Sequence, residues 1–321
     1  MSAPDTLRVL ITGADGYVGR LLTASLADNP AVGAVIASDI AVPSIARRID
    51  GVTYKSLDVR APDLDGLLGE HRVDVVVHLA AIVSPKPEHT REFLYAVDVD
   101  GTKNVLDACV KAGVKKVIVT SSGAAYGYHP ENARQLDEDA PLRGNVEFAY
   151  SDHKRIVEQM LAEYREEHPQ LGQLILRVGT ILGDDVKNQI TALFEGKVVL
   201  GLRGIATPFV FIWDHDLVSI IETGITTVKT GIFNVAGDGS MTLREIATRL
   251  KKPYVELPPG LVVAALGVLK RFGLTRYGPE QVRFLRHRPV LNNRRLKADF
   301  GYRPRLSSRE VFERYRVAAH G

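Results

Sequence analysis

The stretch at residues 10–22, LITGADGYVGRLL, constrains the fold of this chain most, because three evenly spaced glycines join an apolar run to a helical pattern. Gly13 allows a sharp turn out of a buried strand, and Gly16 has no Cβ that would hold a pyrophosphate away from the backbone. Gly19 lets the following helix lie close to the sheet, and the free amides at the start of that helix favour a bound phosphate. The spacing predicts a dinucleotide-binding turn, with a glycine-rich turn that binds nothing as the alternative.

Asp39 follows the next apolar run, at residues 35–37, and comes 20 residues after Gly19. An acid at the tip of the second strand can accept hydrogen bonds from the hydroxyls of an adenosine ribose, and it repels a 2′-phosphate. We therefore expect NAD rather than NADP, although a loop could bring Arg47 and Arg48 near the same position. The alternative for Asp39 alone is an ordinary polar strand end.

Apolar runs and helical patterns alternate along the first 180 residues. This alternation predicts a parallel sheet whose strands are joined by right-handed crossover helices. We expect an α/β fold with a doubly wound parallel sheet and a smaller, mostly helical C-terminal region that binds the substrate. The dinucleotide-binding domain should span residues 1–180, with 209–238 returning to it, and the substrate region should comprise 181–208 and 239–321. The expected strands are 8–11, 35–37, 52–55, 73–79, 115–120 and 174–178, and the longest expected helices are 90–112 and 150–168.

Composition argues against several classes of protein. A net charge of +3 is too small to indicate a nucleic-acid partner, and contents of 45% hydrophobic and 25% charged residues are ordinary for a soluble globular chain. The single cysteine, Cys109, cannot form an internal disulfide and suits a reducing compartment. Residues 1–6 show no signal-peptide pattern, and the apolar run at 261–269 is too short to cross a bilayer. We expect a cytoplasmic protein without membrane insertion, and we assign no metal site.

Tyr150 and Lys154 lie four residues apart on an expected helix, so their side chains share one face. A lysine ammonium beside a phenol favours the phenolate. Tyr150 can then exchange a proton with a substrate hydroxyl while a nicotinamide cofactor takes or gives hydride. Ser122, at the end of the preceding strand, is placed to hydrogen-bond the same substrate oxygen. The alternative is a surface Tyr/Lys pair and a serine that caps a helix.

The glycines, Asp39, Ser122 and the run Tyr150-Ser151-Asp152-His153-Lys154 together resemble the extended short-chain dehydrogenase/reductase family, which includes the NAD-dependent epimerases and dehydratases. The resemblance covers about residues 7–239. It implies a Rossmann fold with bound NAD, Tyr150 as the acid/base, Lys154 on the nicotinamide ribose and Ser122 as the orienting hydroxyl.

The same resemblance implies further cofactor contacts and an assembly. Asp58 and Val59 should lie near the adenine, Ala80 and Ala81 should line the cofactor, and a homodimer should form through the two helices that carry Asn104 and Tyr150. A helix-capping role is the alternative for Asp58, and we expect His78 to be packed rather than catalytic. The complete set of expected cofactor contacts is Gly13, Gly16, Tyr17, Val18, Gly19, Asp39, Asp58, Val59, Leu79, Ala80, Ala81, Thr120, Tyr150, Lys154 and Arg177.

Several departures from the family pattern bear on the substrate. Asp98 replaces the leading asparagine of the family's Asn-Val-x-Gly-Thr-x-Asn motif, which leaves the role of that position open. Gly123-Ala124 stands where dehydratases place Asp-Glu, so sugar dehydration is not expected. Members that act on nucleotide sugars carry an asparagine at the position of Thr180 and an arginine shortly before Phe209. Loss of that arginine removes a charge-assisted, bidentate contact with a diphosphate.

These observations favour an NAD-dependent dehydrogenase or reductase that acts on a relatively hydrophobic alcohol or ketone. The alternative is an NAD-dependent nucleotide-sugar epimerase, in which Arg203, Arg283 or Arg286 could supply the phosphate contact. A third class is a protein that keeps NAD for stability alone, and the retention of Tyr150, Lys154 and Ser122 argues against it.

Overall fold

The computed structural model describes residues 6–186, 188–274 and 278–320. Its centre is a seven-stranded sheet in the order β11-β6-β5-β4-β1-β2-β3, in which every neighbouring pair is parallel. This arrangement confirms the expected doubly wound α/β fold. The strands are β1 (Leu7–Thr12), β2 (Val32–Asp39), β3 (Val52–Ser56), β4 (Val75–His78), β5 (Lys116–Ser122), β6 (Gly172–Val178) and β11 (Gly231–Val235).

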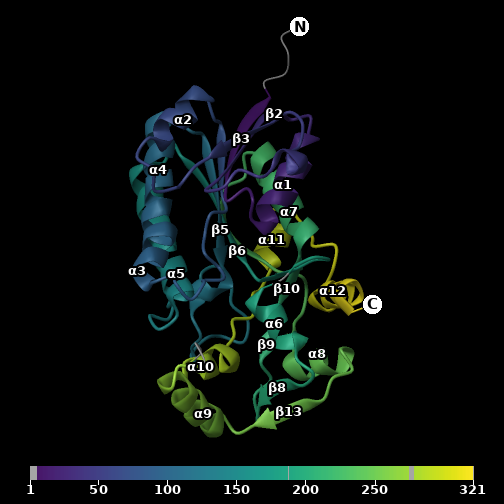
Figure 1. The fold of residues 1–321 in the computed structure, drawn as a ribbon. Coiled ribbons are helices and arrows are strands. Elements are labelled where there is room, and N and C mark those ends of the chain that lie inside the picture. Colours follow the sequence, from purple (N-terminus) through teal and green to yellow (C-terminus); the bar gives the residue numbers. More distant parts are fainter. Residues whose placement is uncertain (1–5, 187, 275–277, 321) are drawn as a thin grey trace.

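Helices cover both faces of this sheet (Figure 1). On one face lie α1 (Tyr17–Ala27) and α7 (Asp214–Thr226), and on the other lie α2 (Leu64–Glu70), α4 (Gly101–Ala112) and α5 (Ala149–Glu167). The sheet is therefore the middle layer of three, and its strand ends point towards the loops that carry the candidate site.

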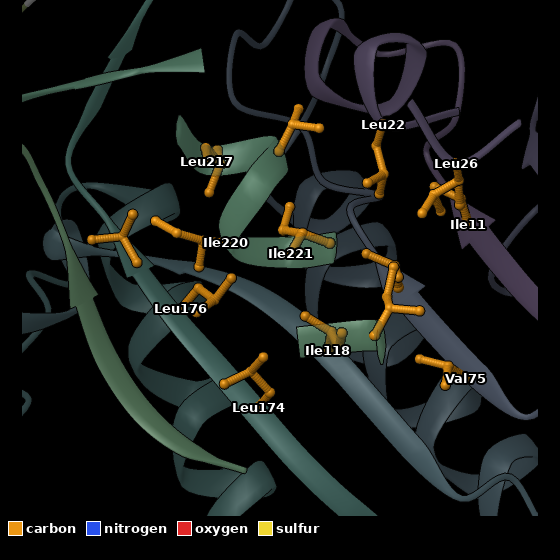
Figure 2. Packing of buried hydrophobic residues seen from close by; sticks show 14 of the residues in the cluster. Ile11, Leu22, Leu26, Val75, Ile118, Leu174, Leu176, Leu217, Ile220 and Ile221 are labelled. Atoms are coloured by element: carbon orange, nitrogen blue, oxygen red, sulfur yellow. The ribbon is translucent and has the colours of Figure 1, made fainter. Parts of the chain in front are cut away.

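Successive strand residues pack into opposite cores. Ile11 belongs to the same cluster as Leu22 and Leu217, which lies between the sheet and the helices α1 and α7 (Figure 2). Leu10, its neighbour in sequence, belongs to the cluster on the other face together with Leu106. Each fully buried side chain of this size stabilises the fold by about 1.5–3 kcal/mol. Burial on both faces explains why the strands appear in the sequence as continuous apolar runs.

The expected helix at 90–112 is interrupted. Thr90 caps α3 (Arg91–Tyr95) by accepting a hydrogen bond from the amide of Phe93, and a π-helical turn (Ala96–Asp100) separates α3 from α4. Such turns often lie at functional sites. This one carries Asp98, which is 4% exposed.

The C-terminal region contains three small two-stranded sheets in addition to its helices. They pair β7 (Thr180–Leu182) with β10 (Phe211–Trp213), β8 (Val199–Leu202) with β13 (Tyr254–Leu257), and β9 (Pro208–Phe209) with β12 (Met241–Thr242). A cluster rich in phenylalanine, which includes Phe194, Phe209, Phe211 and Phe312, joins them to α6 (Gln189–Glu195), α8 (Leu243–Arg249) and α12 (Ser308–His320).

Three further helices complete this region. α9 (Pro259–Arg271) and α10 (Gln281–Arg286) lie at the end of the molecule remote from α2, whereas α11 (Arg294–Ala298) lies beside the sheet (Figure 1). Apolar side chains of α9 such as Leu261 and Val268 are exposed, at 58% and 56%. In the part of the chain that the structure describes, no helix has both the length and the apolar character needed to cross a bilayer.

Candidate active site

The glycine turn between β1 and α1 leaves no room for side chains at two positions. Gly13 has a φ of +71°, and a Cβ there would lie 2.7 Å from the amide nitrogen of Ala80. A Cβ on Gly19 would lie 2.2 Å from the carbonyl oxygen of Gly13. Gly16 is exposed and stands at the N-cap of α1, where no side chain caps the helix. The start of α1 is thus open to a phosphate group, and the turn fits the pyrophosphate of a dinucleotide.

A pocket lies beside this turn at the end of β2, lined by Ala14, Asp15, Asp39 and Arg47 among others. The Asp39 carboxylate accepts hydrogen bonds from the amides of Asp15 at 3.0 Å and Ile40 at 2.8 Å. Asp15 in turn forms an ion pair with Arg47 at 3.4 Å. The pocket therefore holds both an acidic side chain and a cation. Arg48 instead packs 5.7 Å from the ring centre of Tyr54.

The loop after β3 carries Asp58 and Val59. The Asp58 carboxylate forms a two-point contact with Arg60, whose Nη2 lies 2.5 Å from Oδ2, and this hydrogen bonding lowers the pKa of Asp58. The side-chain amide of Asn104 donates to the carbonyl oxygens of Val59 and Ala61, both at 2.7 Å. Asn104 of helix α4 thus holds the backbone of this loop in place, while the Asp58 side chain stays half-buried.

His78 ends β4 and is enclosed between two threonines. Its Nδ1 lies 2.8 Å from the hydroxyl of Thr12, and its Nε2 lies 3.0 Å from the hydroxyl of Thr102. Burial lowers the pKa of His78 to about 3, so the ring is neutral at physiological pH. His78 is therefore an uncharged side chain packed in the core, as expected. The half-buried residues Leu79, Ala80 and Ala81 follow at the same edge of the sheet.

Tyr150, Ser122 and Lys154 come together at the end of β5. Burial raises the pKa of the Tyr150 phenol to about 12, and the nearby Ser122 hydroxyl offsets part of that rise. Lys154 is 8% exposed, and its Nζ donates to the carbonyl oxygen of Thr120 at 2.9 Å. The same Nζ lies 5.7 Å from the centre of the Tyr150 ring. A cation thus stands where it can stabilise a phenolate.

A buried pair that the sequence analysis missed lies behind these residues. Nδ1 of His153 is 3.1 Å from Oδ2 of Asp98, and the other carboxylate oxygen accepts from the amide of Ile82 at 3.0 Å. Burial raises the pKa of Tyr150 and lowers that of Lys154, and the negative charge of Asp98 adds to the first shift and opposes the second. Asp98 stood out as a departure from the family motif, but nothing in the sequence pointed to His153 as its partner.

Arg177 lies in β6 and is enclosed in the fold. Its Nε donates to both carboxylate oxygens of Glu158 at 2.9 Å, and its Nη1 donates to the hydroxyl of Tyr126 and the carbonyl oxygen of Glu138, each at 2.8 Å. The ion pair with Glu158 raises the pKa of Arg177 further. These bonds occupy its Nε and Nη1 donors, whereas the resemblance implied a contact with the cofactor.

Tyr17 and Val18 begin α1 and have different surroundings. The Tyr17 hydroxyl donates to Oδ2 of Asp214 at 2.5 Å, across 197 residues of sequence, and Val18 packs against the core beneath α1. Gly183 makes room for this bond, since a Cβ there would lie 1.8 Å from the Asp214 carboxylate. Asp214 therefore ties the start of α7 to the start of α1, beside the glycine turn.

Comparison with known sequences and structures places this site in a family. The sequence model of the NAD dependent epimerase/dehydratase family matches residues 9–202, more than half of the chain. An uncharacterized protein of Mycobacterium tuberculosis is 28% identical over 96% of this chain and 82% of its own length.

Two relatives with named activities match over shorter stretches. UDP-glucose 4-epimerase of Azospirillum brasilense is 33% identical over 56% of this chain and 50% of its own length. Sterol-4-alpha-carboxylate 3-dehydrogenase of Saccharomyces cerevisiae is 27% identical over 62% of this chain and 55% of its own length.

The fold has close counterparts among solved structures. UDP-glucose 4-epimerase of Thermus thermophilus, solved in complex with NAD, superposes with a TM-score of 0.72 at 22% identity and covers 98% of this chain and 100% of its own. This likeness supports the Rossmann architecture of the whole chain. With the match at residues 9–202, it leads to one assignment: the chain belongs to the NAD-dependent epimerase/dehydratase family, within the extended short-chain dehydrogenases/reductases.

Proposed function

We propose that this protein is an NAD-dependent dehydrogenase or reductase that interconverts an alcohol and a ketone, with Tyr150 as the acid/base. The observation that carries the proposal is the placement of the Lys154 ammonium 5.7 Å from the centre of the Tyr150 ring, with the Ser122 hydroxyl close enough to lower the pKa of the phenol. These three side chains come from two elements and meet at the end of β5, the edge at which open α/β sheets bind ligands.

Each residue of this triad has a distinct task in alcohol oxidation. The hydroxyl of Ser122 orients the substrate oxygen, and the Tyr150 phenolate accepts its proton. NAD supplies the hydride acceptor when it is bound. Lys154 holds its positive charge beside the phenolate, and its bond to the Thr120 carbonyl fixes the ammonium in place. In reduction, Tyr150 returns the proton to the alkoxide oxygen.

The proposed cofactor site extends from the glycine turn to the triad. The backbone at Gly13, Gly16 and Gly19 and the start of α1 take the pyrophosphate, and Asp39 takes the adenosine ribose. The other residues of the proposed cofactor lining are Tyr17, Val18, Asp58, Val59, Leu79, Ala80, Ala81 and Thr120. Residues 181–208 and 239–321 form the proposed substrate region.

Nucleotide-sugar epimerisation is the second candidate, because a UDP-glucose 4-epimerase is among the relatives. Thr180 and Thr207-Pro208 count against it, since they replace polar and cationic residues that epimerases use to hold a nucleotide sugar. Dehydration has less support still. A Cβ on Gly123 would lie 3.1 Å from the side chain of Leu291, and Ala124 is 8% exposed, so no carboxylate stands at either position.

The test is a spectrophotometric assay with NAD and a panel of secondary alcohols, followed by the reverse assay with reduced NAD and ketones. A net change in the absorbance of reduced nicotinamide supports the dehydrogenase. Conversion of UDP-glucose to UDP-galactose with no net absorbance change supports the epimerase and contradicts the first proposal.

Two further predictions concern the protein in solution and in the cell. We propose a homodimer formed through the outer faces of α4 and α5, and a light-scattering mass of twice the chain mass, 35.2 kDa, would support it. A mass of one chain would contradict it. The cytoplasmic location also stays a prediction, which fractionation of the source cells would test.

A further inference from the structure

Arg288 is half-buried and, unlike the buried Arg177, forms no ion pair with a carboxylate of the described residues. Its guanidinium carbon lies 4.1 Å from the ring centre of Phe209 and 4.6 Å from that of Phe284. Its Nε donates to the carbonyl oxygen of Pro208 at 3.2 Å. Nη1 is buried and makes no hydrogen bond with any residue that the structure describes. Two aromatic rings thus cover the guanidinium, and its Nη1/Nη2 end meets no acceptor among the residues that the structure describes.

A guanidinium whose Nη1 is buried without an acceptor is costly to keep charged. Burial lowers the pKa of Arg288 to about 10, which is the direction expected for a charge that leaves water without a counter-ion. Arg177, by contrast, has Glu158 at 2.6 Å, and nearby Arg283 has Glu147 at 2.9 Å. Attraction to the two aromatic rings offsets only part of the cost. An anion that arrived with a ligand would supply the missing partner.

The surroundings of Arg288 connect it to the proposed catalytic tyrosine. The ring of Tyr128 lies 5.0 Å from that of Phe284 and 5.4 Å from that of Phe148. Phe148 is the N-cap of α5, two residues before Tyr150. Arg288 and Tyr150 are also close enough to the Tyr128 hydroxyl to influence its pKa in opposite directions. Aromatic rings in contact therefore run from the guanidinium to Phe148, at the start of the helix that carries Tyr150.

A second polar group in the same place also lacks a partner. Thr207 precedes Pro208, the residue that holds Nε of Arg288, and its side chain is fully buried. Its hydroxyl makes no hydrogen bond with the described residues, and its backbone has a φ of +46°, in the left-handed region that β-branched residues rarely adopt. Strain and an orphaned hydroxyl thus coincide next to the unpaired cation, a combination that often marks ligand sites.

We propose that Arg288 binds the carboxylate of the substrate, which makes the substrate an apolar hydroxy acid or oxo acid. The planar Nη1/Nη2 end matches the two oxygens of a carboxylate, and one cation balances a single negative charge. Phe209, Phe284 and Tyr128 favour an apolar or aromatic body between the acid and the reacting carbon. This inference rests on the proposed dehydrogenase function and adds a substrate class to it.

Binding to the NAD-loaded protein tests the inference directly. Isothermal titration would compare 3-hydroxy-3-phenylpropanoate with its methyl ester, and with UDP as a diphosphate probe. We expect the acid to bind at least ten times more tightly than the ester. Arg288→Met should weaken binding of the acid about 30-fold and remove the preference over the ester. Arg288→Lys should keep part of the preference for the acid over the ester, because lysine retains the positive charge but lacks the planar guanidinium group.

Arg271→Met is the matched control, since it removes the same charge from an exposed site on α9. It should change the affinity for the acid less than twofold. Equal binding of acid and ester by the unchanged protein would overturn the inference. UDP binding that exceeds that of the acid and is lost in Arg288→Met would also overturn it, in favour of a diphosphate site.

Thermal unfolding without ligand separates binding from a structural role. Removal of an unpaired buried charge should leave the midpoint of Arg288→Met unchanged or raise it by a few degrees. A fall of more than about 5 °C would mean that the guanidinium holds the fold together, and it would overturn the inference. Turnover by Tyr150→Phe tests the proposed dehydrogenase mechanism separately, and full activity of this variant would refute that mechanism. The difference in binding between acid and ester does not depend on turnover, so it tests the carboxylate site independently.

Discussion

Nδ1 of His153 lies 3.1 Å from Oδ2 of Asp98, and the two side chains are only 1% and 4% exposed. An ionised carboxylate can only accept, so His153 donates this bond. The pair stands close enough to the residues that carry the proposed chemistry for the Asp98 charge to act on both: it adds to the rise that burial causes in the Tyr150 pKa and opposes the fall that burial causes in the Lys154 pKa. A negative charge there makes the phenolate harder to form and keeps the lysine protonated.

Asp98→Asn should therefore move the pH dependence of kcat/KM to lower pH. Loss of the negative charge favours the Tyr150 phenolate and disfavours the Lys154 ammonium, so both pKa values fall. Ser122 and Glu158, which also act on these groups, stay in place. We expect a shift of about one pH unit. Asp100→Asn, an exposed change two residues away, is the control, and an identical profile for both variants would refute the role of Asp98.

Tyr150→Phe should lower kcat by about 10³-fold, because general acid/base catalysis contributes on the order of 10²–10⁴. The ring and its packing remain, so the Kd for NAD should change less than twofold. Tyr164→Phe is a suitable control on the same helix, since Tyr164 is bonded to Asp107 and stands away from the site. Turnover of Tyr150→Phe equal to that of the parent protein would remove Tyr150 from the mechanism.

Asp39→Ala should weaken NAD more than NADP. Asp39 loses its hydrogen bonds to the ribose hydroxyls in the variant, whereas the repulsion of a 2′-phosphate disappears. Arg47 lines the same pocket and remains available to that phosphate. We expect NAD to bind about tenfold more weakly, as loss of a charged hydrogen bond implies. Calorimetric titration of both cofactors is the measurement. Arg47→Ala should act in the opposite direction and weaken NADP more than NAD. An unchanged preference between the two cofactors in Asp39→Ala would contradict the role assigned to Asp39.

The sheet could be predicted from sequence because its signals are local. Five of the expected strands, β1, β2, β4, β5 and β6, are buried and contain apolar runs, and Gly13 and Gly19 mark a turn that only glycine fits. The π-helical turn at Ala96–Asp100 could not be predicted, because its apolar spacing differs little from that of an α-helix. The two-residue strands β9 and β12 are too short to show an alternating pattern.

The residues of the candidate site also differ in how far local sequence signals could predict them. Tyr150, Lys154 and Ser122 could be found because they recur at fixed places in a motif. Pairs such as Asp98 with His153 depend on which helices come into contact, and a separation of 55 residues leaves no periodic signal. Arg288 and its missing partner could be recognised only once the surrounding rings were in place.

Glu158→Gln should destabilise the protein by about 3–5 kcal/mol, because it leaves the Arg177 charge buried without its partner. The two side chains are 4% and 2% exposed and lie 2.6 Å apart. Urea unfolding would measure the loss. Asp107→Asn is the control, since its ion pair with Lys103 is about half exposed and should contribute less than about 1 kcal/mol. Equal losses of unfolding free energy in the two variants would show that the buried ion pair stabilises the protein no more than the exposed one.

Gly19→Ala tests whether the glycine turn is needed for its shape. The added Cβ would lie 2.2 Å from the Gly13 carbonyl oxygen, so the turn or the helix must shift. We expect a loss of about 1–3 kcal/mol in stability from this overpacking, and at least tenfold weaker NAD binding, because the amides of the turn move away from the pyrophosphate. Gly66→Ala in α2 is the matched control: its Cβ meets nothing within 4 Å, and the change should stabilise the helix by about 0.4–1 kcal/mol. Chemical unfolding and NAD titration of both variants give the comparison. If Gly19→Ala bound NAD as tightly as Gly66→Ala does, close contact between helix and turn would be irrelevant to cofactor binding.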